Sequence, residues 1–273
     1  MSDEPRTYGY AGLPEEVQRL EAQAKSMEAI LQRELQIMKL TPDMRMLDAG
    51  CGTGAVTRKI AQHISPGEAV GIDIDPLFLE NAKTLAMNEG IENIRFEHGN
   101  VDSLSYEDGY FDGAYCRLVL MHVNDPVHTV RELARVTKRG GFVAVSDNDD
   151  GVVISYPDAP KFQRLWRLYG QRARERGVNR YIGRELYSIF SEAGLKSIQV
   201  FPFPLYATQE DPAVVRGLVS IPMQIIALSK DDMVGGGWFT EGEYQEMVEE
   251  VEETLSHPGG FAMGMSFFAV GVK

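Results

Sequence analysis

The chain has little cysteine and lacks long apolar runs, and each of these absences excludes a class of protein. Only two of its 273 residues are cysteine, Cys51 and Cys116, and they form no metal-ligand spacing. No uninterrupted apolar segment reaches the ~20 residues that span a bilayer, and no cationic start leads into an apolar stretch as in a secretion signal. We therefore expect a cytoplasmic protein with no metal and no membrane partner.

Positive charge is scarce as well. Lysine and arginine total 27 against 40 aspartates and glutamates, which gives a formal net charge of −13. Because binding to a phosphate backbone relies on clustered basic residues, we expect no nucleic-acid partner. Basic residues concentrate only in residues 161–180. That segment is typical of a solvated helix face, with a site for a small anionic substrate as the alternative.

The apolar pattern indicates the fold class. Hydrophobic residues make up 44% of the chain, enough for one large domain with an appended or inserted cap. Strand-like and helical segments alternate from residue 43 to 203, which favours a doubly wound α/β fold with a mostly parallel sheet. The pattern predicts strands near residues 45–49, 69–74, 93–97, 111–116, 141–147 and 196–203. It predicts helices near residues 14–40, 54–63, 76–89, 125–138 and 183–194, with Gly140 and Gly141 ending one of them.

The most informative local feature is the run from Met46 to Gly54, MLDAGCGTG. An apolar stretch ends in an acid and then in three glycines at alternate positions, which is typical of a strand, a tight turn and a helix start. The next apolar strand ends at Asp73. In nucleotide-binding folds an acid roughly 20 residues downstream of the glycine turn binds the ribose hydroxyls, and Asp73 is at about that spacing. The alternative is that Asp73 caps the helix beginning near Pro76, but Asp75 already supplies that cap.

Two features argue against a dinucleotide ligand. The turn reads Gly-x-Gly-x-Gly, whereas the dinucleotide fingerprint is Gly-x-Gly-x-x-Gly. The carboxylate of Asp48 precedes the turn and would repel a pyrophosphate. A ligand that joins a nucleoside to an ammonium or sulfonium group suits this charge better.

On these residues the chain resembles the class I S-adenosylmethionine (SAM)-dependent methyltransferases, in particular the ubiquinone/menaquinone-methyltransferase-like enzymes that act on small molecules. Leu47–Gly54 is similar to their first motif and Gly71–Asp73 to their ribose-binding strand. The resemblance continues through the adenine-contact segment (His98–Leu104), the fourth strand (Phe111–Cys116), the segment after it (Leu118–Val123) and the fifth strand with its glycine turn (Val136–Val145). It implies a seven-stranded Rossmann-like sheet whose last strand is antiparallel.

The resemblance also implies a set of residues that bind SAM as the cofactor. They are Tyr8, Gln23, Asp48, Gly50, Gly52, Asp73, Ile74, Asn100, Val101 and Arg117. The family commonly has aspartate where this chain has Asn100, so Asp102 is an alternative adenine contact. Arg117 is expected to pair with the SAM carboxylate or with an anionic substrate. For Tyr8 and Gln23, ordinary packing and solvated surface are the alternatives.

We predict four segments along the chain. Residues 1–40 form a helical segment over the cofactor site, and residues 41–205 form the SAM-binding core with a helical insertion at about 150–180. Residues 206–260 form a helical cap, and residues 261–273 form the last strand. Because loops of this length are often functional, the cap is expected to cover the substrate. A homodimer through the N-terminal helix or the cap is a further possibility.

Methyl transfer from a sulfonium needs a general base only if the nucleophile carries a proton of high pKa. The candidate catalytic residues are His122, Asp147 and Asp149, with a structural hydrogen bond for the histidine and a turn for the aspartates as alternatives.

Aromatic residues in the cap segments favour a small aromatic or apolar acceptor; they are Tyr156, Phe162, Trp166, Tyr169, Phe203, Tyr206, Trp238 and Phe239. The alternative function is a SAM- or nucleoside-binding protein without catalysis.

Overall fold

A computed structural model describes residues 14–210 and 212–273 of the chain, so the predicted cofactor residue Tyr8 lies outside the described residues. The chain forms two compact units. Unit 1 combines residues up to Asp147 with Arg184–Phe201 and Phe267–Lys273, and unit 2 combines Asn148–Gly183 with Pro202–Ser266.

Unit 1 contains five parallel strands in the order β3-β2-β1-β4-β5. Their bounds are β1 Arg45–Ala49, β2 Glu68–Asp73, β3 Ile94–His98, β4 Phe111–Arg117 and β5 Thr137–Asn148. The central strands are apolar and fully buried, as in Met46, Val70, Ala114 and Val143, which is typical of parallel sheets covered on both faces. The chain order reverses between β1 and β4, and ligands of open α/β sheets bind beyond the carboxyl ends of the strands at such a point.

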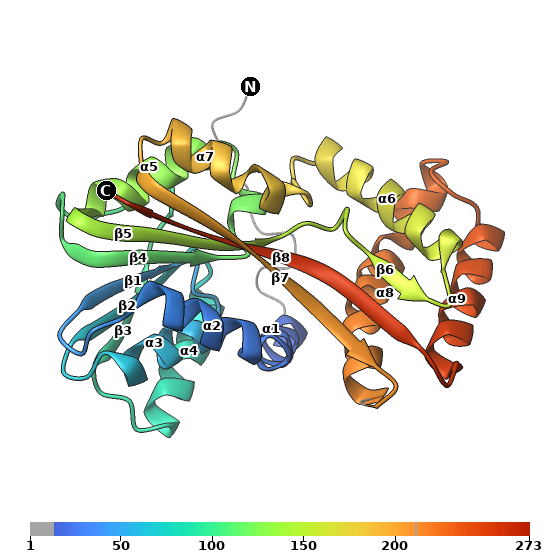
Figure 1. Ribbon diagram of the computed structural model, residues 1–273, viewed down its shortest axis with the longest axis horizontal. Helices are drawn as coiled ribbons and strands as arrows, with labels where there is room; N and C mark the ends of the chain where they lie inside the picture. Colours follow the sequence, from blue (N-terminus) through green and yellow to red (C-terminus); the bar gives the residue numbers. More distant parts are fainter. Residues whose placement is uncertain (1–13, 211) are drawn as a thin grey trace. The chain divides into compact units, whose positions relative to one another are not determined.

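Helices cover both faces of this sheet. They are α1 (Pro14–Ser26), α2 (Glu28–Met38), α3 (Ala55–His63), α4 (Pro76–Asn88), α5 (Pro126–Val136) and α7 (Leu186–Glu192), with 3-10 turns at Leu120–His122 and Ile182–Glu185. Helices α2, α3 and α4 lie on one face, and α5 and α7 lie on the other (Figure 1). Asp75 and Asp125 cap α4 and α5 by accepting hydrogen bonds from backbone N–H groups, each directly before a proline.

Unit 2 is mainly helical. It contains β6 (Ile154–Tyr156), α6 (Pro160–Glu175), α8 (Pro212–Gly235) and α9 (Glu241–Ser256), together with parts of β7 (Lys196–Thr208) and β8 (Phe261–Val272). Its core joins the three helices through buried apolar side chains that include Leu165, Trp166, Ile226, Phe239 and Met247. Strand β6 pairs antiparallel with β8 in this unit.

The doubly wound, mostly parallel α/β fold with a late antiparallel strand is confirmed, with four differences in detail. Among the described residues the sheet has eight strands rather than seven, because the three-residue β6 adds a strand that is too short to produce a sequence pattern. The helix expected over 14–40 divides at Met27 into α1 and α2. Strand β7 extends to Thr208 instead of ending near 203. Gly140 and Gly141 lie inside β5 and not at a helix end, since α5 already ends at Val136.

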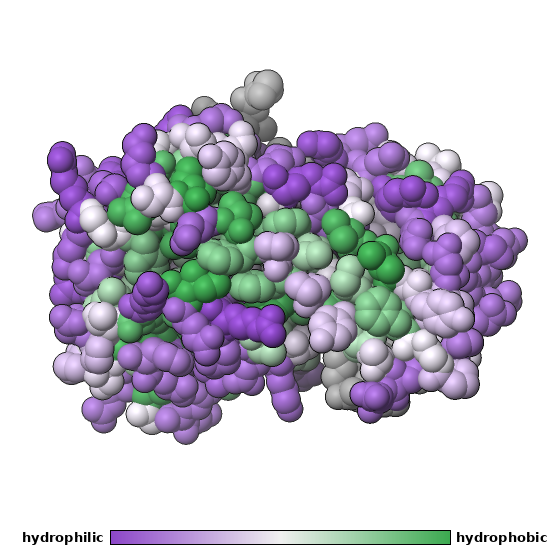
Figure 2. All heavy atoms as spheres, in the orientation of Figure 1, coloured by the Kyte–Doolittle hydropathy of each residue, from purple (hydrophilic) through white to green (hydrophobic). Residues whose placement is uncertain are grey.

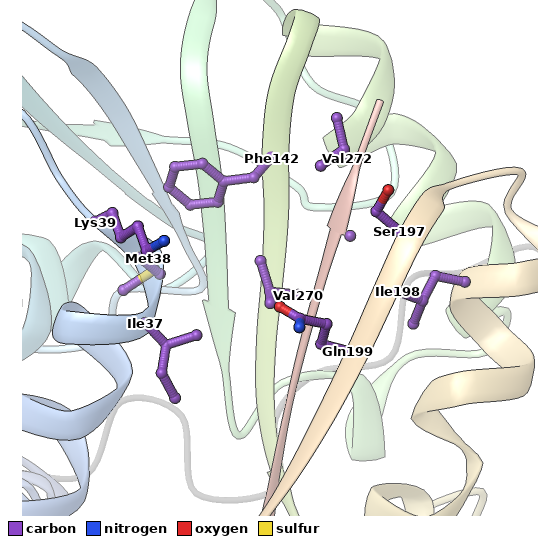
Figure 3. A pocket seen from close by; sticks show the side chains of 10 residues that line it. Ile37, Met38, Lys39, Phe142, Ser197, Ile198, Gln199, Val270 and Val272 are labelled. Atoms are coloured by element: carbon purple, nitrogen blue, oxygen red, sulfur yellow. The ribbon is translucent and has the colours of Figure 1, made fainter.

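Apolar surface remains exposed over β5 and the adjoining ends of β7 and β8 in unit 1, between more hydrophilic helices (Figure 2). A groove of about 480 Å³ lies there, and Ile37 and Met38 of α2 line it on one side and Ser197 and Ile198 of β7 on the other (Figure 3). None of the predicted site residues within 14–210 and 212–273 lines this groove. Separately, within the part of the chain that the structure describes, no helix has the length and apolarity needed to cross a membrane.

Candidate functional site

The glycine run forms a tight turn at the carboxyl end of β1. The backbone N–H groups of Gly50 and Cys51 both donate to the Ile72 carbonyl, at 2.9 and 2.8 Å. Gly50, Gly52 and Gly54 have φ values of +75°, +53° and +74°, in the left-handed region that favours glycine. A Cβ atom on Gly50 would lie 2.4 Å from a side-chain carbon of Val119, so a larger residue does not fit there. The turn therefore presents bare backbone beyond the sheet.

Asp73 ends β2 and is tied to this turn. Its Oδ2 accepts a hydrogen bond from the Gly52 N–H at 2.8 Å, and its Oδ1 accepts one from the Asp75 N–H at 2.9 Å. Burial raises the pKa of Asp73, while these backbone donors counteract the shift. Asp75, not Asp73, caps α4, since its own Oδ1 accepts from the Leu77 N–H at 2.9 Å. The structure thus excludes a helix cap as the role of Asp73.

Asp48 is almost fully buried in β1, directly before the turn. Its Oδ2 accepts a hydrogen bond from the Thr57 hydroxyl of α3 at 2.6 Å, a partner that the sequence analysis missed. Burial raises the pKa of Asp48 to about 7, although the Thr57 hydrogen bond and the charge of Arg117 oppose this shift. A nearby cationic ligand would stabilise the ionised form further.

The shifted pKa predicts how stability depends on pH. Because folding raises the pKa of Asp48 from 3.8 to about 7, the folded state binds this proton more tightly. The resulting stabilisation is complete below the unfolded pKa and is lost as the pH rises through the folded pKa. Asp48→Asn, which still accepts a hydrogen bond from Thr57, removes this loss. The free energy of unfolding of the variant minus that of the wild type, measured in urea, should therefore be about 2.5 kcal/mol larger at pH 8 than at pH 5.

The exposed Asp43, in the turn before β1, supplies the control for this experiment. Asp43→Asn should leave the difference from the wild type equal at the two pH values. An equal difference for Asp48→Asn as well would contradict the shifted pKa.

The predicted adenine contacts follow β2 and β3. Ile74 is 38% exposed, which leaves its apolar surface open beside Asp73. The Asn100 side-chain oxygen accepts a hydrogen bond from the Asp102 N–H at 2.9 Å, and Val101 lies between them. The Asp102 carboxylate accepts a hydrogen bond from the Thr129 hydroxyl, so it supports α5.

Arg117 ends β4, next to the glycine turn. Its Nε and Nη2 atoms are buried and have no hydrogen-bond partner among the described residues. Buried N–H groups of a guanidinium that lack an acceptor are costly unless a negative group compensates them. The position and the free donors therefore fit an anionic group of a ligand.

The N-terminal helix reaches the glycine turn through a residue that the sequence analysis did not identify. The Glu21 carboxylate of α1 accepts from the Thr53 hydroxyl at 2.5 Å and pairs with Arg58 at 2.8 Å. The predicted Gln23 instead accepts a hydrogen bond from Arg19 at 3.3 Å within the same helix. Glu21 belongs to no recognisable sequence motif, so only the folded structure identifies it as a contact of the glycine turn.

The three predicted catalytic residues have different surroundings. Asp147 is fully buried in β5, with its Oδ2 3.4 Å from the Met121 N–H. His122 is half-buried in the 3-10 turn after β4. Asp149 lies in unit 2, where its Oδ1 accepts from the Gly151 N–H at 2.9 Å and closes a turn.

Most of the aromatic residues expected to line an acceptor pocket lie in the core of unit 2 instead. Phe162, Trp166 and Phe239 are at most 6% exposed, whereas Tyr156 and Tyr206 are 59% and 61% exposed.

No group of three or more metal-binding side chains occurs within residues 14–210 and 212–273. Burial raises the pKa of both cysteine thiols well above the ordinary value.

Comparisons with known proteins agree with this geometry. A family model described as a methyltransferase domain matches residues 47–145. The demethylmenaquinone methyltransferase of Bacillus cytotoxicus is 30% identical over 182 residues, which cover 62% of this chain and 77% of that protein. An uncharacterised 37.1 kDa protein in transposon TN4556 of Streptomyces fradiae is 31% identical over 70% of this chain, which spans only 55% of that relative.

Solved structures show the same fold at lower identity. YcgJ from Bacillus subtilis has a TM-score of 0.59 and 20% identity, with 91% of this chain and 98% of that chain covered. Phosphoethanolamine N-methyltransferase 2 from Haemonchus contortus, solved in complex with SAM, has a TM-score of 0.54 and 19% identity, with 89% and 52% covered. The chain therefore belongs to the class I SAM-dependent methyltransferases, and SAM is its cofactor.

Proposed function

We propose that the protein transfers the methyl group of SAM to a small aromatic or apolar acceptor. One observation carries the acceptor class: the relative that is 30% identical over 77% of its own length is a demethylmenaquinone methyltransferase, whose name gives an aromatic, apolar acceptor. The second unit lies wholly outside the matched residues 47–145, so we assign the choice of acceptor to it. Its exposed Tyr156 and Tyr206 are the aromatic side chains available for this role.

In this proposal the residues around the glycine turn hold SAM. Asp73 accepts hydrogen bonds from the ribose hydroxyls, and the backbone of Gly50 and Gly52 lies against the methionine part. Ile74 covers one face of the adenine, and Asn100 with Val101 meets its edge. The exposed apolar surface of Ile74 and the position of Asp73 at the carboxyl end of β2, tied to the glycine turn, support these roles.

Two charged residues are assigned to the amino acid end of SAM. Arg117 pairs with the carboxylate, because its buried Nε and Nη2 atoms have no partner among the described residues. The ionised carboxylate of Asp48 stabilises the positive charges of the ammonium and sulfonium groups. Gln23 of α1 and Tyr8 complete the predicted set.

Bound SAM supplies a methyl group on a sulfonium whose departure leaves a neutral thioether, so the protein contributes mainly alignment and exclusion of water. Where the acceptor must lose a proton, we assign Asp147 and His122 as candidate bases, because Asp147 lies at the carboxyl end of β5 and His122 in the turn after β4. We give Asp149 no catalytic role, since its carboxylate closes a turn.

The acceptor class is tested with isotope-labelled SAM and three acceptors. A short-chain demethylmenaquinol should become labelled, whereas phosphoethanolamine and sarcosine should not. Labelling of a polar amine alone would overturn the aromatic or apolar acceptor. Saturable SAM binding without transfer to any acceptor in a broad screen would favour the non-catalytic alternative.

Three finer expectations accompany this proposal. The net charge of −13 supports an acceptor that is a small molecule and not a nucleic acid. A cytoplasmic location and a homodimer remain predictions of the sequence. Sedimentation of the purified protein tests the homodimer directly.

A further inference from the structure

Glu34 is a fully buried carboxylate in α2 for which the proposed function has no use. Its two oxygens have one hydroxyl donor each. Tyr115 of β4 donates to Oε2 at 2.6 Å, and Ser146 of β5 donates to Oε1 at 2.6 Å. Both donors are fully buried too. A single carboxylate thus joins α2 to two neighbouring strands of unit 1.

These two donors flank Arg117 on the sheet. Tyr115 precedes Arg117 by two residues on β4, so their side chains share one face of the sheet. Ser146 is directly opposite Arg117 in the pairing of β4 with β5. Asp48 is opposite Tyr115 in the pairing of β1 with β4. Glu34, Arg117 and Asp48 therefore belong to one buried polar layer between the sheet and helices α2 and α3.

The charges in this layer act on one another. Burial raises the pKa of Tyr115 well above its ordinary value, the carboxylate of Glu34 raises it further, and the charge of Arg117 opposes the shift. The tyrosine therefore remains protonated and donates to Glu34. The half-buried Arg117 has two buried nitrogens, Nε and Nη2, whose positive charge favours nearby acids, and Glu34 and Asp48 are buried acids of this layer.

Resting on the proposed contact of Arg117 with the SAM carboxylate, we propose that Glu34 is a positioning residue for Arg117. It fixes α2 against β4 and β5 on either side of Arg117 and compensates the guanidinium charge. The N–H groups on the Nε and Nη2 atoms of Arg117 are thereby held ready for the carboxylate of the cofactor. Glu34 itself does not touch SAM.

The test compares two ligands that differ in the amino acid end. S-Adenosylhomocysteine carries the amino acid carboxylate, and 5′-methylthioadenosine lacks the whole amino acid end. Glu34→Gln keeps the side-chain size and removes the charge. It should weaken S-adenosylhomocysteine binding in calorimetry about three- to tenfold, as expected for coupled neighbours, and leave methylthioadenosine binding unchanged. Arg117→Ala should give the same selective loss, and the double variant should add little to it.

Glu28→Gln is the matched control, since Glu28 is on the same helix but pairs with Lys59 at the surface. It should change the affinity for neither ligand. Ser146→Ala, which removes one donor to Glu34, is a milder second variant and should give a smaller selective loss. Equal losses for both ligands in Glu34→Gln and Ser146→Ala, or no loss in either, would overturn the positioning role. If the wild type binds neither ligand, the proposed function itself is wrong.

Discussion

Replacing Asp73 with alanine is expected to weaken binding of SAM and of S-adenosylhomocysteine at least tenfold. The carboxylate sits at the end of β2, where both of its oxygens already accept backbone hydrogen bonds from Gly52 and Asp75. It is thus fixed in place before the ribose hydroxyls reach it. A hydrogen bond to a charged group contributes about 1.5–3 kcal/mol, and 1.4 kcal/mol corresponds to a factor of ten. Isothermal titration calorimetry measures both affinities.

Asp125→Ser serves as the matched control for this variant. It also removes a carboxylate at the start of a helix, but serine keeps the cap of α5 that Asp125 provides. The control should bind both ligands like the wild type. Unchanged affinity in Asp73→Ala, with circular dichroism showing a folded protein, would show that Asp73 does not bind the ribose.

Gly54→Ala should lower the free energy of unfolding by about 2–5 kcal/mol. A Cβ atom at Gly54 would lie 2.6 Å from the Phe96 ring and 3.0 Å from the Cβ of Ala82. Overpacking costs about 1–3 kcal/mol, and a left-handed conformation costs an alanine about 1–2 kcal/mol more than a glycine. Unfolding in urea, with the midpoint and the slope compared to the wild type, measures the change.

Gly90→Ala separates the two contributions. Gly90 has a φ of +68°, close to the +74° of Gly54, but a Cβ atom there would meet no atom within 4 Å. Its replacement should cost only the conformational part, about 1–2 kcal/mol. Equal costs at the two positions would mean that the close approach of Phe96 to the glycine turn is not a constraint.

The sequence predicts those features of the site that depend on neighbours along the chain. The apolar run before Asp48 and the glycines after it locate β1 and the turn, and Asp75 followed by Pro76 correctly locates a helix cap. These residues are recognisable because a strand end, a positive φ and a cap each restrict which amino acids fit.

Contacts between distant residues leave no such local trace. Glu34 lies 81 residues from Tyr115 and 112 from Ser146, so no spacing in the sequence links them. The aromatic residues of unit 2 show the same limit. Their pattern in the sequence predicts apolar surroundings, but it does not say whether those surroundings are a packed core or a ligand pocket. Trp166 and Phe239 are core residues in the structure.

The most direct test of the central claim is isothermal titration of the 273-residue protein with SAM, S-adenosylhomocysteine and NADH. We expect saturable binding of both sulfur nucleosides and no binding of NADH, because Asp48 precedes the glycine turn and would repel a pyrophosphate. Failure of both sulfur nucleosides to bind would contradict the assignment of the glycine turn, Asp73 and Arg117 to a SAM site.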